Sequence, residues 1–247
     1  MSGAVDHDAI ARRADELRLQ LGLGNGPVVD IAATLRSAGV KLVQRRLGLG
    51  GPDGMYVRRG GIGFVLLNSD MYLPRQRFTA AHELGHHVLG HQAAVDENVL
   101  DVKGRAQEEE ANTFAASFLV PRGALHERLR KAGAITPDWV FDVAVEYGVS
   151  YNTLVYRLHN CRLLPRGAEQ RDELKAASRS VVAEALDMPQ SPKETVFPPE
   201  FVRDAIAAHV AGEITFERLA ELLEIPEARL QRRLKGAVQA DYDAGAT

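Results

Sequence analysis

Residues 77–91 read RFTAAHELGHHVLGH and place His82, Glu83 and His86 in the pattern His-Glu-x-x-His. On a helix, residues four apart lie on one face, so both imidazoles can reach a single metal ion. Apolar residues recur on the same side, which predicts a buried stripe where histidines without a partner would be costly. Glu83 is turned by about 100° from His82, so it stays off the metal but close to a bound water. The stretch therefore predicts a helix with two metal ligands and a general base.

A third ligand is needed, because the same short pattern also occurs by chance on surface helices. Catalytic zinc takes three protein ligands and keeps one position open for water. The known extension of the pattern by a glycine and a third histidine fails, since Leu89 and Gln92 occupy those positions. A glutamate from a following helix is the remaining common solution.

A second stretch, EEEANTFAASFLVP at 108–121, offers three adjacent glutamates. Glu108 shares a helix face with apolar residues that are expected to point inward, whereas Glu109 and Glu110 lie on other faces. We therefore expect Glu108 as the third ligand, and Glu109 and Glu110 as a solvated charge cluster near a helix N-terminus. Asn112, one turn along from Glu108, could orient a metal-bound imidazole.

The other potential metal donors of the chain carry less weight. His87 and His91 are four residues apart, but His87 points about 100° away from His86, and His91 follows a helix-ending Gly90. We expect both at the rim of the site or on the surface. The single cysteine, Cys161, excludes an internal disulfide and a thiolate zinc site, and it fits a reducing compartment.

Composition limits the function classes. The 247 residues carry a formal net charge of −3, with 26% charged and 45% hydrophobic residues, as in ordinary globular proteins. A protein that mainly grips a phosphate backbone is usually more basic. Residues 5–21 lack the apolar core of a signal peptide, and no stretch approaches the ~20 apolar residues of a membrane span. We therefore expect a cytoplasmic protein with no membrane partner.

Periodicity predicts an α+β chain in which a small antiparallel sheet precedes a mostly helical remainder. Pro74 is placed to open the helix that carries the metal motif, and Gly90 to close it. Helices are expected near 9–21, 28–38, 74–90, 107–120, 137–164 and 200–236, strands near 41–44, 54–57 and 61–67, a polar loop at 91–106, and a proline-bearing linker at 188–200.

The stretch at 139–160, WVFDVAVEYGVSYNTLVYRLHN, follows a helix-turn-helix pattern. Gly148 permits the tight turn and Ser150 could cap the second helix. One interpretation is a DNA-binding module, and the other is a packing unit that supports the catalytic domain. The charges of residues 138–166 cancel, and the cluster at 200–236 is no more basic, so direct DNA binding is the less favoured interpretation.

The two motif stretches resemble the ImmA/IrrE family of metallopeptidases, which combines R-F-T-x-A-H-E-x-G-H with E-x-x-A-N-x-F-A-A-x-x-L-x-P. The likeness reaches upstream through the segment from about 27 to 70 and covers roughly half of the chain. It implies a zincin-like catalytic domain whose ligands are His82, His86 and Glu108, with Glu83 as the base, in agreement with the helix geometry. The domains expected are a zincin-like metallopeptidase domain at 1–123, a helix-turn-helix-like helical unit at 124–168 and a C-terminal helical region at 169–247.

The resemblance also implies a function. Members of this family cleave helix-turn-helix transcriptional repressors in stress responses or in phage and mobile-element control, so a regulatory zinc-dependent endopeptidase with such a repressor as partner is expected. A metal with three protein ligands activates a water, and Glu83 would take its proton and pass it to the leaving amine. Manganese is an alternative to zinc, because a site of two histidines and a glutamate tolerates both. Tyr56 and Arg77 are candidates to stabilise the oxyanion, by their proximity to the motif segments.

Two other functions stay open. A DNA-associated or antitoxin-like regulator would use the metal for structure or sensing. The presence of Glu83 counts against this alternative, because a purely structural site needs no base. A general housekeeping peptidase is the third hypothesis, and the regulator-like helical appendage makes it the weaker one.

Overall fold

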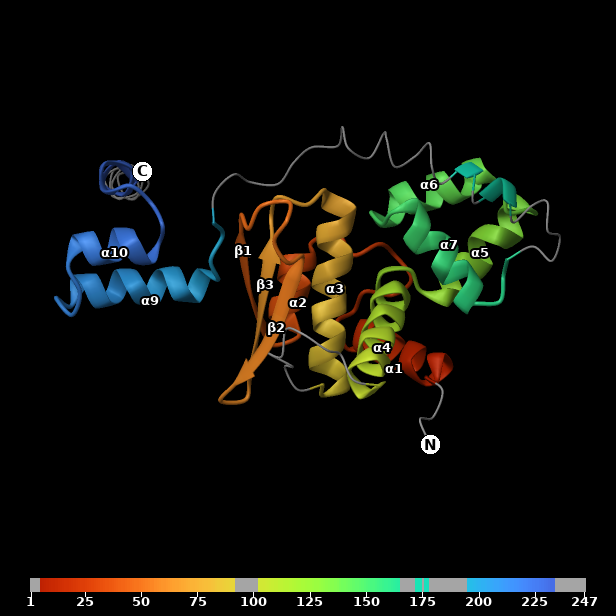
Figure 1. Cartoon of the computed structure of the whole chain (residues 1–247), viewed down its shortest axis with the longest axis horizontal. Helices are drawn as coiled ribbons and strands as arrows, with labels where there is room; N and C mark the ends of the chain where they lie inside the picture. The colour runs from red at the N-terminus through yellow and green to blue at the C-terminus, as the bar shows by residue number, and fades with distance from the viewer. Residues whose placement is uncertain (1–4, 92–101, 165–171, 175, 178–194, 234–247) are drawn as a thin grey trace, which may run out of the picture. The chain divides into compact units, whose positions relative to one another are not determined.

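The computed structural model describes residues 5–91, 102–164, 172–174, 176–177 and 195–233 (Figure 1). The chain divides into two compact units, residues 1–193 and 194–247. The first unit combines a small three-stranded sheet with the helices that carry both motif stretches. This mixed architecture confirms the predicted α+β fold class.

Two helices precede the sheet, α1 (His7–Gln20) and α2 (Ile31–Ser37), and both were predicted. Each begins at an aspartate whose carboxylate accepts a hydrogen bond from the backbone N–H three residues on, namely Asp6 for α1 and Asp30 for α2. Such caps satisfy backbone donors that have no partner within the helix. The sequence thus fixes where both helices begin.

The sheet consists of β1 (Val40–Arg45), β2 (Gly54–Arg59) and β3 (Ile62–Asn68), in the order β1-β3-β2. β2 and β3 form an antiparallel hairpin, but β1 pairs parallel to β3, so the prediction of a wholly antiparallel sheet was wrong. Gly60 and Gly61 both have positive φ, which suits a two-residue hairpin turn. The hairpin folds β3 back between β2 and β1, and this makes β1 its parallel neighbour.

The connection from β1 to β2, residues 46–53, is held at the end of β3 by Asn68. Asn68 is fully buried. Its Oδ1 accepts two backbone N–H bonds, and its Nδ2 donates to the carbonyls of Gly48 and Pro52. Three of these four hydrogen bonds go to backbone groups of the connection, and the fourth goes to the N–H of Asp70. The side chain thus gives partners to backbone groups that have none in regular secondary structure.

The metal motif lies on α3 (Leu73–Leu89), which begins beside Pro74 and ends at Gly90 as predicted. Gly90 has a φ of 74°, the left-handed conformation that glycine favours at helix ends. α4 (Val102–Leu119) carries the second motif and begins earlier than the predicted Gln107. Lysine, arginine and alanine in that extra turn are good helix formers. Most of the expected polar loop at 91–106, residues 92–101, lies outside the described residues.

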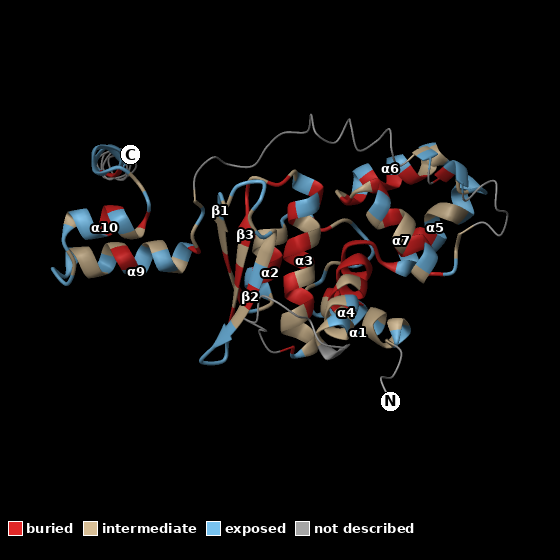
Figure 2. Cartoon of the chain, in the orientation of Figure 1, coloured by how far each residue is buried: buried red, intermediate tan, exposed pale blue. Residues whose placement is uncertain are grey.

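The core of the first unit lies between the sheet and these helices. α2 and α3 contact the sheet and each other, so they cover the same face, and α4 packs against α3 and α1. Figure 2 shows buried residues along the inner sides of α3 and α4. Gly85 of α3 permits the close approach of α4, because a Cβ there would lie 3.1 Å from Cδ1 of Phe114.

Three helices follow α4 within the described range 102–164. α5 (Arg122–Ala132) leads into α6 (Pro137–Tyr147), and α7 (Tyr151–Asn160) follows a turn at Gly148, where φ is 61°. The hydroxyl oxygen of Ser150 accepts a hydrogen bond from the backbone of α7 and caps it, as expected.

Helix α7 faces the protein interior along most of its length. Arg157 is only 2% exposed and donates from Nε to the carbonyl of Val120, just after α4. Of the residues of this helix, only Asn152 and His159 are exposed. A helix that reads DNA needs an accessible face of polar side chains. The packing therefore favours the interpretation of α6 and α7 as a supporting unit.

The second unit contains α9 (Pro199–Val210), α10 (Phe216–Leu222) and a further helical segment at 227–233. These helices enclose a small core of their own, made of Ala205, Leu219, Ala220, Leu223 and Leu230. Most of the expected linker at 188–200 lies outside the described residues. Within the described ranges, no helix is both long and apolar enough to cross a membrane.

Candidate metal centre

The structure brings together the three ligands expected from the sequence. His82 and His86 project from successive turns of α3, with their Nε2 atoms 3.0 Å apart. Glu108 reaches them from α4, with Oε2 3.1 Å from Nε2 of His82 and Oε1 3.4 Å from Nε2 of His86. Among the described residues, this is the one group of His, Cys, Asp and Glu whose donor atoms converge closely enough to hold a metal ion.

The spacing of these donor atoms fits zinc. Two ligand atoms bound to zinc at 2.0–2.1 Å with a tetrahedral angle lie roughly 3.3 Å apart. The two Nε2 atoms are 3.0 Å apart, and they lie 3.1 and 3.4 Å from different oxygens of Glu108. With one ligand atom from each residue, the three atoms lie within 4.8 Å of one another. Two imidazoles and one carboxylate form a donor set that suits zinc and also manganese. The residues present therefore fit a divalent metal and leave a coordination position for water.

The first metal-facing imidazole is held from behind by Asn112, as expected. Nδ1 of His82 lies 3.0 Å from Oδ1 of Asn112. A ring whose Nε2 lone pair faces a metal must carry its proton on Nδ1, so Nδ1 donates and the amide oxygen accepts. Asn112 stands one helical turn after Glu108, so α4 supplies both a candidate ligand and the support of another candidate ligand.

The second imidazole has a partner that the sequence interpretation missed. Nδ1 of His86 lies 2.9 Å from Nδ1 of His91, and Nε2 of His91 lies 2.9 Å from Oε2 of Glu110. His91 is 7% exposed, so its expected place at the rim or surface was wrong. Glu110, expected in a solvated cluster, is 31% exposed and also pairs with His91. The left-handed Gly90 turns the chain back, and the backbone N–H of His91 bonds to the carbonyl of His86. This glycine was the available signal, because its turn returns the next residue to the end of the helix.

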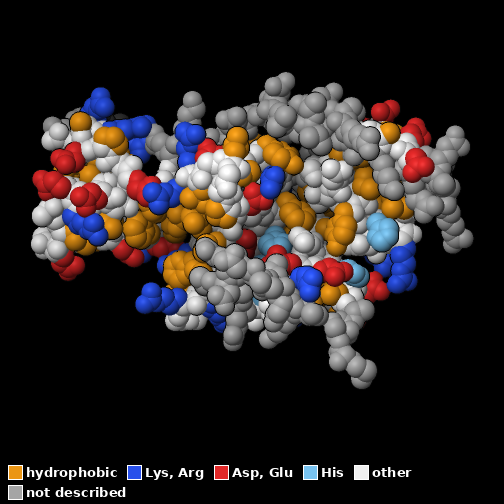
Figure 3. Space-filling model, in the orientation of Figure 1, with side chains coloured by type: hydrophobic (Ala, Val, Ile, Leu, Met, Phe, Trp, Pro, Cys, Tyr) orange, Lys and Arg blue, Asp and Glu red, His pale blue; other side chains and the backbone are white. Residues whose placement is uncertain are grey.

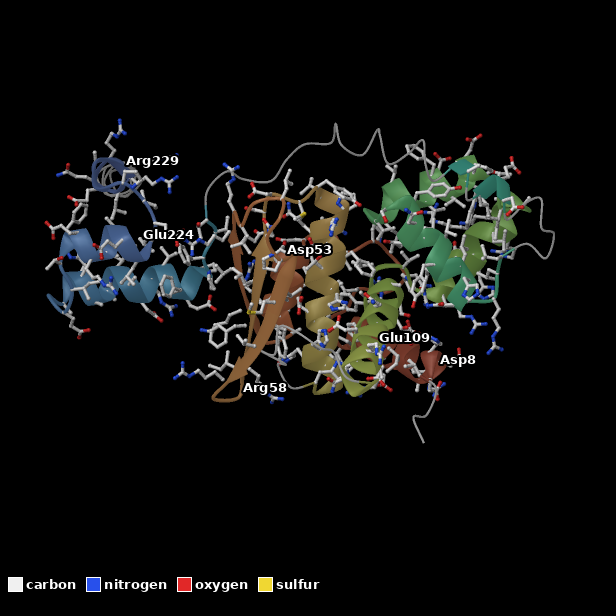
Figure 4. All side chains as sticks on the ribbon, in the orientation of Figure 1. Asp8, Asp53, Arg58, Glu109, Glu224 and Arg229 are labelled. Carbon is white, nitrogen blue, oxygen red and sulfur yellow. The ribbon has the colours of Figure 1, made fainter. Side chains whose placement is uncertain are left out.

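Glu109, in contrast, lies where the sequence predicted. Its side chain is 53% exposed, and its Oε1 lies 3.3 Å from Nε2 of His7 in α1. Figure 4 shows it on the side of α4 near Asp8. An exposed pair of this kind adds little to stability.

Glu83 is buried beside the ligands, with 8% of the residue exposed. Burial raises the pKa of Glu83, an effect opposed by the nearby imidazoles of His82 and His86. A carboxylate whose pKa is shifted upward is a better proton acceptor than an exposed one. On its outer side Glu83 faces the start of β2, where a Cβ on Gly54 would lie 3.1 Å from Oε1. This contact could not be predicted from local periodicity, because it joins a strand to a helix.

The ligands also stabilise one another electrostatically. Hydrogen bonds with His82 and His86 hold the pKa of Glu108 well below its usual value, so this carboxylate is ionised at neutral pH. Burial lowers the pKa of His82, but the bond to Glu108 and the charges of Glu83 and Glu108 outweigh burial and raise it. A concentration of negative charge around two imidazoles is the environment expected of a cation site.

The two residues suggested for the oxyanion differ in their surroundings. The Arg77 guanidinium donates to the carbonyls of Gly148 and Val28, at 3.0 and 2.5 Å, so it ties α3 to the turn before α7. Tyr56 of β2 lies on the same side of its strand as Gly54, and its hydroxyl is 2.9 Å from Nδ1 of His87. The contacts of Arg77 are structural, whereas Tyr56 bonds to His87, which lies one helical turn after Glu83 on α3.

The side chains of the candidate ligands are partly exposed. Figure 3 shows that histidine side chains reach the surface of the protein on the face in view. His82 and His86 are 14% and 13% exposed, and Glu108 is 42% exposed. A catalytic metal needs such access, because water and substrate must reach it.

Comparison with known proteins agrees with this geometry. The family model of the IrrE N-terminal-like domain, a peptidase family, matches residues 35–159, which is half of the chain and includes both motif stretches. A search of the curated proteins found no match. Among solved structures, a Mycobacterium tuberculosis transcriptional regulator aligns with 17% identity and a TM-score of 0.43 over 66% of this chain and 48% of that one. This chain thus spans about half the length of that regulator. With the family match over half of its length, the chain belongs to the IrrE N-terminal-like peptidase family.

Proposed function

We propose that this protein is a cytoplasmic, zinc-dependent regulatory endopeptidase that cleaves a helix-turn-helix transcriptional repressor. The observation that carries the proposal is the buried carboxylate of Glu83 next to a converging group of two imidazoles and Glu108. A metal site that served only structure would need no such base. Membership of a peptidase family supports the same reaction class.

In this proposal His82, His86 and Glu108 hold the metal, with manganese as an alternative to zinc. When bound, the metal lowers the pKa of water and polarises a carbonyl. Glu83 accepts a proton from the water whose oxygen bonds to the peptide carbon. As the carbon–nitrogen bond breaks, Glu83 returns the proton to the leaving amine. Asn112 orients the imidazole of His82 throughout.

The remaining parts of the chain have supporting roles in this proposal. We assign the peptidase domain to residues 1–123, a helical support to 124–168 and a C-terminal helical region to 169–247. The buried face of α7 and the bonds of Arg77 to the turn before it support the second assignment. The repressor substrate and a role in stress or mobile-element control rest on the family resemblance.

The test compares new protein N-termini in host cells that express the wild type, Glu83→Gln or Glu109→Gln. Glu83→Gln keeps a similar shape but cannot act as a base, whereas Glu109 is exposed on the outer side of α4 and is a matched control. We expect cleavage products that depend on Glu83 but not on Glu109, with a helix-turn-helix repressor among them. Identical profiles for all three proteins, under resting and stress conditions, would remove the peptidase proposal.

One observation favours a second candidate function, a DNA-associated regulator with a structural or sensory metal. In the second unit, α10 and the segment 227–233 flank a short turn, and only Leu230 of that segment is buried. Its exposed residues include Arg229, Arg232 and Arg233. Salt-dependent binding of duplex DNA by the full chain, lost in Arg232→Glu and kept in Glu83→Gln, would favour this function. Absence of binding at low salt would exclude it.

A further inference from the structure

We propose that His91 and Glu110 form a positioning pair that fixes the protonation and orientation of His86, and that this pair sets the affinity of the metal centre. The inference rests on the metal site of the proposed function. It concerns two residues that coordinate nothing themselves. They act on the metal through His86.

The pair forms an unbroken chain of hydrogen bonds that leads away from the ligands. It starts at Nδ1 of His86, passes through both nitrogens of His91 at 2.9 Å per step, and ends at Oε2 of Glu110. The side chain of His91 is 6% exposed and that of Glu110 is 31% exposed. This row of hydrogen bonds thus begins at His86 and ends at the carboxylate of Glu110, which water can reach.

Only one placement of the protons allows both hydrogen bonds, from His86 to His91 and from His91 to Glu110, to form. Nε2 of His86 must present its lone pair to a metal, so the proton of His86 lies on Nδ1 and is donated to His91. His91 then accepts at Nδ1 and carries its own proton on Nε2, which it donates to Glu110. If the proton of His91 moved to Nδ1, two N–H groups would face each other at 2.9 Å. Glu110 therefore selects the tautomer of His91, and His91 selects that of His86.

The local fold does not need these side chains. The turn after α3 is already closed by the left-handed Gly90 and by the bond from the backbone N–H of His91 to the carbonyl of His86. The imidazole of His91 and the carboxylate of Glu110 come in addition to this turn. A side chain that the backbone does not require, yet which is buried against a ligand, is expected to act on that ligand.

The two histidine ligands are consequently supported in different ways. His82 is backed by the neutral amide of Asn112, whereas His86 is backed by an imidazole that ends at a carboxylate. A carboxylate behind a metal-binding imidazole raises the basicity of that ligand. Loss of such a partner typically weakens metal binding by about 10-fold to 100-fold. We expect an effect in this range when Glu110 is removed.

The experiment measures zinc affinity of the purified full chain by competition with a chelator, in the absence of any substrate. The variants are Glu110→Ala, Glu110→Gln, His91→Phe and the matched control Glu109→Ala, which removes the neighbouring glutamate of the same helix. We expect Glu110→Ala and His91→Phe to raise the zinc Kd by about 10-fold to 100-fold. Glu110→Gln should have a smaller effect, because its amide oxygen still accepts a hydrogen bond without charge. Glu109→Ala should bind zinc as the wild type does.

A second readout separates positioning from a general loss of structure. The visible absorption of the cobalt-loaded protein reports on the ligand field, and it should shift in Glu110→Ala but not in Glu109→Ala. The urea midpoint of the metal-free proteins should be similar for both. The proposal is overturned if Glu110→Ala keeps the wild-type zinc Kd and cobalt spectrum. The glutamate variants decide this even if His91→Phe does not fold.

These measurements distinguish failure of the positioning pair from failure of the proposed peptidase function. If proteolysis does not depend on Glu83 while the zinc affinity still depends on Glu110, the positioning pair stands and the peptidase proposal falls. If the wild type binds zinc no better than a His82→Ala, His86→Ala double variant, the metal centre and the positioning pair fall together.

Discussion

Gly54 offers a sharp test of how the sheet positions the proposed base. A Cβ on this residue would lie 2.5 Å from Cγ2 of Thr79, 3.1 Å from Oε1 of Glu83 and 3.2 Å from the carbonyl oxygen of Leu66. β2 can therefore approach α3 only if its first residue has no side chain. We predict that Gly54→Ala both destabilises the fold and displaces Glu83.

The size of the effect follows from these distances. Carbon atoms in contact normally lie about 3.5–4.0 Å apart, so the new methyl group is about 1 Å too close to Thr79. Overpacking of this kind typically costs about 1–3 kcal/mol, and the stiffer unfolded chain offsets roughly 0.4–1 kcal/mol of it. We expect a net loss of about 1–2 kcal/mol in the free energy of unfolding. A misplacement of Glu83 by about 1 Å would reduce kcat by about 100-fold.

The measurements are the urea midpoint of unfolding and kcat on the cleaved substrate. They compare the wild type with Gly54→Ala, Gly50→Ala and the double variant Gly54→Ala, Thr79→Ser. Gly50→Ala is the matched control, because a Cβ at Gly50 meets no atom within 4 Å. The double variant Gly54→Ala, Thr79→Ser removes the methyl group that is contacted most closely, so it should regain most of the stability. If Gly54→Ala has the same urea midpoint and kcat as Gly50→Ala, the inferred contact between β2 and the base is wrong.

Two further substitutions test the supports of the site. Asn68→Ala should lower the free energy of unfolding by roughly 2–4 kcal/mol, because four hydrogen bonds of a buried side chain are lost at about 1 kcal/mol each. An unchanged urea midpoint would mean that the β1–β2 connection does not depend on this residue. Arg77→Gln should lower the free energy of unfolding by about 1–3 kcal/mol. It should leave the zinc Kd and kcat unchanged, because the Arg77 donors bind backbone carbonyls. A fall in kcat without loss of stability would instead place Arg77 in the reaction.

The sequence was sufficient for the parts of the site that depend on local geometry. Pro74 and Gly90 gave the ends of α3, and the four-residue spacing gave the shared face of His82 and His86. Helical periodicity also separated Glu108 from its two neighbours, because only one of three adjacent residues can share a face with the apolar positions of α4. Each of these inferences uses a period that the backbone itself imposes.

The strand order and the contacts between elements depend on which helices and strands pack together. The sequence predicted a strand at 41–44, within the observed β1 (Val40–Arg45), but it contains no information on whether the partner of this strand runs parallel or antiparallel. The order β1-β3-β2 arises because the β2–β3 hairpin folds back toward β1. Likewise, the pairing of His91 with Glu110 joins the turn after α3 to α4. A helical projection of α3 ends at Gly90, so it cannot show where His91 lies or that His91 meets Glu110.

The close approach of α3 and α4 brings the two histidines of the motif together with Glu108. Gly85 stands between the two histidines, and a Cβ there would lie 3.1 Å from the Phe114 ring and 3.3 Å from Cα of Ala111. Neither can retreat easily, since both are fully buried in the core. A larger residue at position 85 would therefore push α4 outward by some tenths of an ångström and carry Glu108 away from the imidazoles. Because the two imidazoles and the carboxylate of Glu108 must reach one ion from two helices, such a shift matters for the proposed metal site. Glycine at this position of the motif is thus favoured by the packing of α3 against α4, and this packing is what the proposed metal site depends on.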